Sequence, residues 1–202
     1  MSIAIIDYGA GNLRSVEKGF QAVGAQAEIT KDATFIRSAK GIVLPGVGSF
    51  DAALTELRNL GLEKLIEEAI ALNKPFLGIC LGMQHLFDSS EEGKLKGLQI
   101  LKGKVVRFKT STLSVPHMGW NRLQVKHKSP IFDGLEEGAM MYFAHSYYVV
   151  PEDETIVAAQ TDYGINFCSS IRKGNLFGIQ FHPEKSGENG LKILNNFAKL
   201  CS

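Results

Sequence analysis

The sequence lacks an excess of charge of either sign. Its 22 lysines and arginines nearly balance 21 aspartates and glutamates, which leaves a net charge of +1 over 202 residues. Proteins that bind nucleic acid typically carry a clear basic excess or a basic run, and this sequence has neither. It also has no apolar run near the ~18 residues that a membrane-spanning helix needs. We therefore expect neither nucleic acid nor a membrane among its partners.

Cysteine is scarce as well. The three cysteines, Cys80, Cys168 and Cys201, cannot all pair within one chain, and no Cys-x-x-Cys spacing occurs. This pattern argues against a disulfide scaffold, and the short apolar N-terminus has no charged segment before it, unlike a secretory signal. We expect a protein of the reducing cytoplasm.

Hydrophobic residues make up 45% of the chain and charged residues 21%, which is typical of a globular protein, and the length fits a single domain over residues 1–202. The first half alternates apolar strand-like segments with helical spacing. Strands are predicted at Ile3–Asp7, Ala25–Thr30, Gly41–Leu44 and Pro75–Ile79, with helices near 13–23 and 62–70. Strands that are apolar throughout indicate a parallel sheet covered on both faces.

The second half is different, because strand-like segments follow one another with few helices between them. They lie at Gly97–Phe108, Asn121–Lys126, Met140–Val150, Thr155–Gln160, Asn166–Arg172 and Leu176–Phe181. A last helix carries apolar residues from Leu191 to Ala198. The predicted fold class is α/β: a doubly wound, mostly parallel sheet with helices on both faces and an antiparallel or mixed extension in the second half.

The segment Gly78-Ile79-Cys80-Leu81-Gly82 lies where the fourth strand meets a helix, whose start is expected at Leu81–Phe87. It has the form of a nucleophile elbow, with cysteine in place of serine. The flanking glycines let strand and helix pass closely, the N–H of Leu81 can donate to an oxyanion, and the helix N-terminus favours a thiolate. A lone cysteine is more often a small buried hydrophobe, but its glycine-flanked position at this junction favours the nucleophile.

His182 is the candidate base, because it follows the strand Leu176–Phe181 in the run Gln180-Phe181-His182-Pro183-Glu184. In an extended backbone residues i and i+2 face the same way, so Glu184 can orient the imidazole. The alternative is a surface His-Pro turn. The zinc-deaminase motif needs a downstream Pro-Cys-x-x-Cys, which is missing, and Gly9–Arg14 lacks the third glycine of a dinucleotide loop. We expect no metal and no cofactor.

These features together resemble the class I, triad-type glutamine amidotransferases, whose Gly-x-Cys-x-Gly-x-Gln motif matches Gly78–Gln84. The resemblance implies that Cys80 attacks the side-chain amide of L-glutamine, forms a glutamyl thioester and releases ammonia. His182 would protonate the leaving ammonia and then activate water, and Glu184 would orient His182.

Further motifs resemble one branch of that family, the glutaminase subunits of imidazole glycerol phosphate synthases in histidine biosynthesis. They are IDYGAGNLRS, PGVGSF, PHMGWN, HSYY and GIQFHPEKS. By this resemblance, backbone groups at Val47 and Gly48 complete an oxyanion hole with Leu81. The resemblance also implies a glutamine pocket formed by Gly48, Gln84, His145, Ser146 and Tyr147.

The same resemblance implies a partner, a (β/α)8-barrel cyclase that uses the ammonia to make imidazole glycerol phosphate and an aminoimidazole carboxamide ribonucleotide. A barrel of ~250 residues does not fit in this chain, so the cyclase would be a separate subunit of a heterodimer. The candidate docking residues are Asn12, Arg14, Ser15, Met118, Trp120 and Lys185.

Three other interpretations remain open at this stage. The chain could be the glutaminase of another amidotransferase, such as those of guanylate or anthranilate synthesis, or a cysteine hydrolase that acts alone. It could also be an inactive interaction module, although such proteins typically lose the nucleophile or the base, and this sequence keeps both. If the loop Pro45–Gly48 is not in donor geometry without the cyclase, glutamine hydrolysis will be slow until the partner binds.

Overall fold

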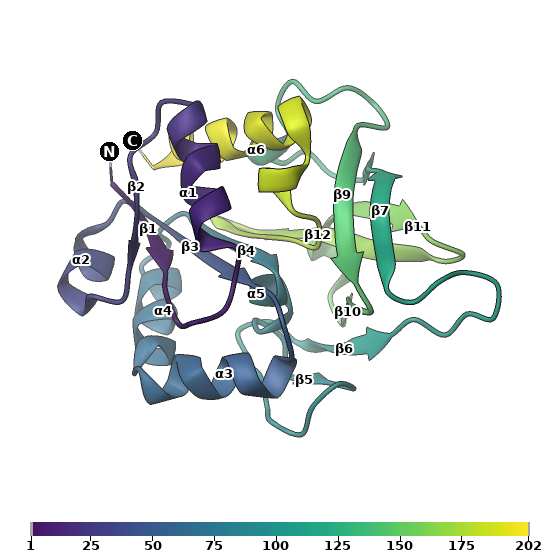
Figure 1. Cartoon of the computed structure of the whole chain (residues 1–202), viewed down its shortest axis with the longest axis horizontal. Coiled ribbons are helices and arrows are strands. Elements are labelled where there is room, and N and C mark those ends of the chain that lie inside the picture. Colours follow the sequence, from purple (N-terminus) through teal and green to yellow (C-terminus); the bar gives the residue numbers. More distant parts are fainter. Residues whose placement is uncertain (1, 202) are drawn as a thin grey trace.

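The computed structural model describes residues 2–201, and Figure 1 shows the arrangement of its elements. The first half alternates strands and helices. Its elements are β1 (Ile3–Ile6), α1 (Leu13–Ala22), β2 (Ala27–Thr30), α2 (Ala33–Ser38), β3 (Gly41–Gly46), α3 (Phe50–Asn59), α4 (Leu62–Ala71), β4 (Phe76–Cys80) and α5 (Leu81–Gln84).

Strands dominate the second half until a final helix. The strands are β5 (Ser89–Ser90), β6 (Gly103–Arg107), β7 (His117–Arg122), β8 (Gln124–Val125), β9 (Met140–His145), β10 (Tyr147–Pro151), β11 (Val157–Asp162), β12 (Asn166–Lys173) and β13 (Leu176–Ile179). The helices are three short 3₁₀ turns, η1 (Pro130–Phe132), η2 (Glu154–Ile156) and η3 (Pro183–Lys185), and α6 (Gly187–Leu200).

The main sheet has the order β2-β1-β3-β4-β13-β12-β10-β6-β5. The strands from β2 to β13 pair in parallel, whereas β12 pairs antiparallel with β13, β10 and β11. A separate two-stranded antiparallel ribbon joins β7 to β9. The predicted fold class, a mostly parallel sheet with an antiparallel extension, is confirmed.

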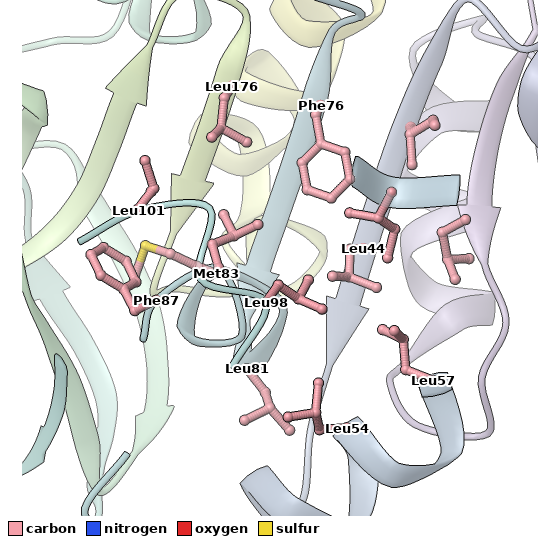
Figure 2. Close-up of a cluster of buried hydrophobic side chains, with 14 of the residues drawn as sticks. Leu44, Leu54, Leu57, Phe76, Leu81, Met83, Phe87, Leu98, Leu101 and Leu176 are labelled. Carbon is pink, nitrogen blue, oxygen red and sulfur yellow. The ribbon is translucent and has the colours of Figure 1, made fainter. Parts of the chain in front are cut away.

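Helices cover the parallel strands on two faces, and each face has its own core. Val16 and Phe20 of α1 pack with Leu194 and Phe197 of α6 in one cluster. Side chains of α3, α4 and α5 form the other, and Figure 2 shows part of it, with Leu44 and Phe76 on neighbouring strands and Leu54 and Leu57 on α3. Since side chains alternate along a strand, each central strand contributes to both cores.

Some element predictions were wrong. The segment predicted as a strand over Gly97–Phe108 becomes β6 only at Gly103. Before that, backbone N–H groups of Leu98 and Ile100 bond to carbonyls of His85 and Leu86, so the apolar residues fill the space beneath α5 instead of a sheet position. Helix α5 begins at Leu81 as expected but ends at Gln84, whereas Leu81–Phe87 was expected to be the start of a longer helix.

Helix α1 begins at Leu13, and the side chain of Asn12 before it makes no capping hydrogen bond. The segment predicted as one strand over Asn121–Lys126 is divided between β7 and β8. Within the described part of the chain, none of the helices has the length and apolarity needed to cross a membrane.

Candidate active site

Cys80 is the last residue of β4 and stands directly before α5. Its backbone has φ 55° and ψ −111°, a conformation that costs a non-glycine residue about 1–3 kcal/mol. The two flanking glycines make the turn possible. A Cβ on Gly82 would lie 1.8 Å from the carbonyl oxygen of Leu44, and one on Gly78 would lie 2.9 Å from the carbonyl oxygen of Gly82. The elbow therefore has the close approach that its sequence predicted.

His182 reaches Cys80 because β4 and β13 are parallel neighbours, with Ile79 opposite Ile179. The two chain segments leave the same edge of the sheet, and the imidazole of His182 lies within hydrogen-bonding reach of the Cys80 thiol. The other side of the ring faces Glu184, at 3.0 Å from Nδ1 to Oε1. Side-chain exposure is 3% for His182 and 1% for Glu184, so water competes little with this contact.

The electrostatic setting of His182 favours its protonated form. Burial by itself would lower the pKa of His182, but the charge and hydrogen bond of Cys80, followed by those of Glu184, raise this pKa to about 10. At neutral pH the ring is thus an imidazolium, with the Glu184 carboxylate as the acceptor at Nδ1. This arrangement stores a proton next to the sulfur, where a leaving group could take it.

A cleft of about 220 Å³ opens beside the sulfur. It is smaller than the ~300–1,000 Å³ sites that hold drug-sized ligands, which favours a small metabolite. It gathers residues from five separate parts of the chain, which are Val47, Gly48, Cys80, Leu81, Gln84, Glu92, Pro116, Met118, Ala144, His145, Ser146 and Tyr147. The residues predicted for the oxyanion hole and for the glutamine pocket therefore lie together.

Glu92 is the one carboxylate among the described residues that line the cleft, and the sequence interpretation missed it. Its Oε2 accepts a hydrogen bond of 2.9 Å from the backbone N–H of Phe50 at the start of α3. Asp51 holds the same loop by accepting from the N–H groups of Lys94 and Leu95, at 2.8 and 3.1 Å. Only this tertiary contact places Glu92 at the cleft, and its local sequence is an ordinary acidic turn.

His145 lines the cleft, but both of its ring nitrogens already have protein partners. Nδ1 lies 2.7 Å from the carbonyl oxygen of Tyr147, and Nε2 lies 3.0 Å from Nδ1 of His117. Burial lowers the pKa of His145 to about 3 and that of His117 to about 4, so both rings are neutral at physiological pH. Neither ring nitrogen of His145 is therefore free to bind a ligand, and this strand can bind one only through its backbone.

The loop after β3 carries the second expected set of oxyanion donors. Tyr8, a further residue that the sequence did not single out, donates a hydrogen bond of 2.7 Å to the carbonyl oxygen of Pro45 and fixes the start of this loop. A Cβ on Gly46 would lie 2.6 Å from the Tyr8 oxygen. Further along, Val47 is 43% exposed and Gly48 has a φ of 100°, a value that favours glycine.

Of the expected docking residues, Met118 lines the cleft itself. Met118 and Trp120 project from the same side of β7 and are 66% and 53% exposed. Trp120 and exposed Lys185 both contact the ring of Tyr142, at 6.1 Å between ring centres and at 5.7 Å from Nζ.

The three candidates at the N-terminus of α1 lie on a helix that packs against η3, the element of Lys185. Asn12 and Ser15 are half-buried there, and Arg14 is exposed and paired with Glu17. Over residues 2–201, no group of three or more histidine, cysteine, aspartate or glutamate side chains could hold a metal ion.

The sequence profile of the family Glutamine amidotransferase class-I matches residues 4–201. The chain belongs to this family, and it is accordingly a glutamine-hydrolysing enzyme.

Two curated relatives are more specific. The imidazole glycerol phosphate synthase subunit HisH of Syntrophotalea carbinolica is 49% identical over 205 residues, which cover 98% of this chain and 100% of the relative. The HisH subunit of Methanosarcina acetivorans is 50% identical over 202 residues, 98% of each chain. The names of these relatives favour imidazole glycerol phosphate synthase, over the enzymes of guanylate and anthranilate synthesis, as the complex in which this glutaminase acts.

Among solved structures, PurLQS of Thermotoga maritima is similar, with a TM-score of 0.77 at 21% identity over 98% of this chain and 97% of that one. At this identity the likeness shows a shared fold.

Proposed function

We propose that Cys80, His182 and Glu184 form a catalytic triad that hydrolyses L-glutamine. The observation that carries the proposal is the placement of His182, which is buried between the Cys80 sulfur and the Glu184 carboxylate. A nucleophile, a base within its reach and a third group that orients the base are the parts that acyl transfer requires.

The reaction follows from this placement. The Cys80 sulfur attacks the side-chain carbonyl carbon of glutamine, and the negative charge moves to the carbonyl oxygen, where backbone N–H groups of Leu81 and of the Val47–Gly48 loop would bind it. His182 gives its proton to the amide nitrogen, the C–N bond breaks and ammonia leaves. A water molecule, deprotonated by His182, then attacks the thioester. The products are glutamate and the free enzyme.

Glutamine selectivity would come from the rest of the cleft. Glu92 supplies the negative charge that suits the α-ammonium group of an amino acid, and Phe50 holds its carboxylate in place. Gln84 and the backbone of Gly48, His145, Ser146 and Tyr147 supply polar groups around the remaining ligand atoms. A cleft of about 220 Å³ is also small for a peptide.

The subunit names of the two relatives support the remainder of the proposal. The chain, as a single domain over residues 1–202 in the cytoplasm, would bind a separate (β/α)8-barrel cyclase as a heterodimer and deliver ammonia to it for histidine biosynthesis. The exposed apolar pair Met118 and Trp120, with Lys185 nearby, suits a docking surface next to the cleft.

The test is to mix the chain with the cyclase subunit of an imidazole glycerol phosphate synthase and to follow both glutamate and imidazole glycerol phosphate. We expect glutamine-dependent product formation, which Cys80→Ala abolishes while added ammonium salts still support the cyclase. Glutamate release should be about 100–1,000-fold slower without the cyclase if one oxyanion donor is then misplaced.

Equal product formation by Cys80→Ala would contradict the proposal and favour a non-catalytic role. Full glutaminase activity without any partner would favour a hydrolase that acts alone. If ammonia reached a guanylate or anthranilate synthase but not the cyclase, the chain would be the glutaminase of another amidotransferase.

A further inference from the structure

We propose that Gln180 is a positioning residue for the nucleophile, whose side-chain amide stabilises the charged sulfur of Cys80. Gln180 follows β13, is fully buried, and its Nε2 lies 3.5 Å from Sγ of Cys80. The inference rests on the proposed function, since it takes Cys80 as the nucleophile. It adds a third contact to the sulfur, besides the histidine and the elbow.

The orientation of the Gln180 amide is determined by its neighbours. Nε2 of Gln84 donates to the carbonyl oxygen of Tyr147 at 3.1 Å, and a backbone carbonyl can only accept. The second N–H of that amide group donates to Oε1 of Gln180, also at 3.1 Å. With its oxygen so engaged, Gln180 must present its own N–H group to Cys80. Rotating the amide by 180° would set two donors against each other.

The carbonyl of Tyr147, on which this orientation depends, is itself held by a second chain of hydrogen bonds. Asn121 donates to Nε2 of His117 at 3.3 Å, His117 donates to His145, and His145 donates to Tyr147. Asn121 has its amide fixed by backbone groups, because its Oδ1 accepts from the N–H of Arg122 and its Nδ2 donates to the carbonyl of Asp162. Along the chain from Asn121 through His117 and His145, each group therefore donates to the next one towards Tyr147.

The other groups around Cys80 do not by themselves account for the stabilisation of a charged sulfur, so an additional N–H donor has a function there. A helix of four residues adds little to the stabilisation of a thiolate, because its macrodipole is short. The titratable groups around the sulfur are Tyr8 from the segment after β1, His182 with Glu184 behind it, and Glu92 and His145 across the cleft.

Among these groups His182 is the cation, and its charge changes during the cycle, because it gives a proton to the leaving ammonia and then takes one from water. The amide of Gln180 has no proton to lose. It can thus still donate when the thioester breaks and the sulfur becomes a leaving anion.

The experiment measures the alkylation rate of Cys80 by iodoacetamide as a function of pH, with the modified residue identified by mass spectrometry. No glutamine or cyclase is needed. In Gln180→Met, a side chain of similar length without a donor, we expect the midpoint of the alkylation profile to rise by about one pH unit. A donor to a charged group justifies a shift of this size, which corresponds to about tenfold slower alkylation below the midpoint.

Gln180→Glu is the second variant, because it keeps the oxygen that Gln84 binds and replaces the donor to sulfur by a carboxylate oxygen. Its midpoint should rise at least as far as that of Gln180→Met. Asn196→Leu is the matched control. Asn196 is a buried amide on α6 that bonds to the carbonyls of Ile131 and Asp133, so its loss affects stability without touching Cys80.

An unchanged midpoint in both folded Gln180 variants would overturn the inference. An equal rise in Asn196→Leu would also overturn it, since a general loss of stability would then explain the shift. Failure of the proposed function would look different: the wild type would hydrolyse no glutamine with the cyclase present, while the alkylation profiles could still differ between variants.

Discussion

Cys80 has a positive φ, a backbone conformation that residues with a side chain disfavour. The residues two positions to either side, Gly78 and Gly82, are glycines because a Cβ would not fit there. The space next to Gly82 ends at the Leu44 carbonyl, 1.8 Å from where a Cβ would lie. A positive φ at a cysteine persists only when the surrounding structure imposes it. The local sequence is sufficient to predict this residue, because the requirement for small neighbours is itself local.

Glu184→Gln should reduce kcat for glutamine hydrolysis by roughly 100- to 10,000-fold, because a neutral partner stabilises the imidazolium of His182 poorly and permits the wrong tautomer. KM for glutamine should change little, since Glu184 is buried behind His182 and does not line the cleft. Steady-state kinetics of glutamate release with the cyclase present would measure both constants.

Glu188→Gln is the control for this substitution, because Glu188 is an exposed carboxylate four residues further along. It should leave kcat unchanged. If the two variants have the same kcat, Glu184 has no orienting role.

Individual residues also mark the limit of prediction from sequence. Cys80, His182 and Glu184 stand in short motifs whose chemistry can be read locally. Glu92, Gln180 and Tyr8 act on the site through partners 37 to 100 positions away in the chain. Nothing in the adjacent sequence indicates these contacts, so sequence reasoning missed them.

At the scale of elements, the site depends on how a few segments are attached to the sheet. Parallel pairing of β4 with β13 brings the elbow and the His-Pro-Glu turn to one edge. The loop that carries Glu92 has little regular structure of its own and is attached to α3 through Asp51. Gly93 in this loop approaches the Asp51 carboxylate so closely that a Cβ would lie 1.9 Å from Oδ1.

Asp51→Ala should therefore loosen the loop and raise KM for glutamine by about tenfold, the effect of roughly 1.4 kcal/mol of lost ground-state binding. The kcat should stay within about twofold of wild type, since Cys80 and His182 belong to other elements. Glutamate release at a series of glutamine concentrations gives both values.

Glu56→Ala provides the comparison, because Glu56 is an exposed acid on the same helix. Its KM should equal that of the wild type. A loss in kcat at constant KM for Asp51→Ala would show that the loop serves the chemical step instead of substrate binding.

At the scale of the whole molecule, three buried neutral histidines make stability depend on pH. Burial lowers the pKa of His85 and of His117 to about 4 and that of His145 to about 3, against 6.5 for exposed histidine. Between pH 6.5 and 4 the unfolded chain binds protons that the folded chain does not, so acid favours unfolding. The effect is up to about 1.4 kcal/mol per pH unit for each histidine.

His182 acts in the opposite direction and in another pH range. Its folded-state pKa is raised to about 10, so the stability that it contributes is fully present below pH 6.5 and is lost as the pH rises towards 10. We expect the free energy of unfolding to be largest near pH 6.5–7 and to fall on both sides. Chemical denaturation at pH 5, 6, 7, 8 and 9 would measure this profile.

In His85→Gln the free energy of unfolding should fall less steeply between pH 6.5 and 4, because unfolding then takes up one proton fewer. His85 is buried, does not line the cleft, and bonds to the carbonyl of Phe50. Replacement of exposed His127 by glutamine should leave the profile unchanged. A wild-type stability that is constant from pH 7 to 5 would contradict the assignment of neutral buried histidines.

The sequence by itself determined the alternation of apolar strands and helices, the antiparallel extension and the three catalytic candidates. These depend on interactions within about ten residues, namely hydrophobic periodicity, a glycine-flanked turn and two side chains in i, i+2 relation. The end of α5 at Gln84 and the loop fold of residues 97–102 depended on apolar side chains filling a space that other elements define.

Tertiary structure alone decided which distant groups meet at the sulfur. Glu92 reached the cleft through Asp51 and Phe50, and the amide of Gln180 received its direction from a carbonyl on β10. Hydrogen bonds of this kind join positions far apart in the chain. Their geometry exists only once the sheet has fixed the edges from which the loops emerge.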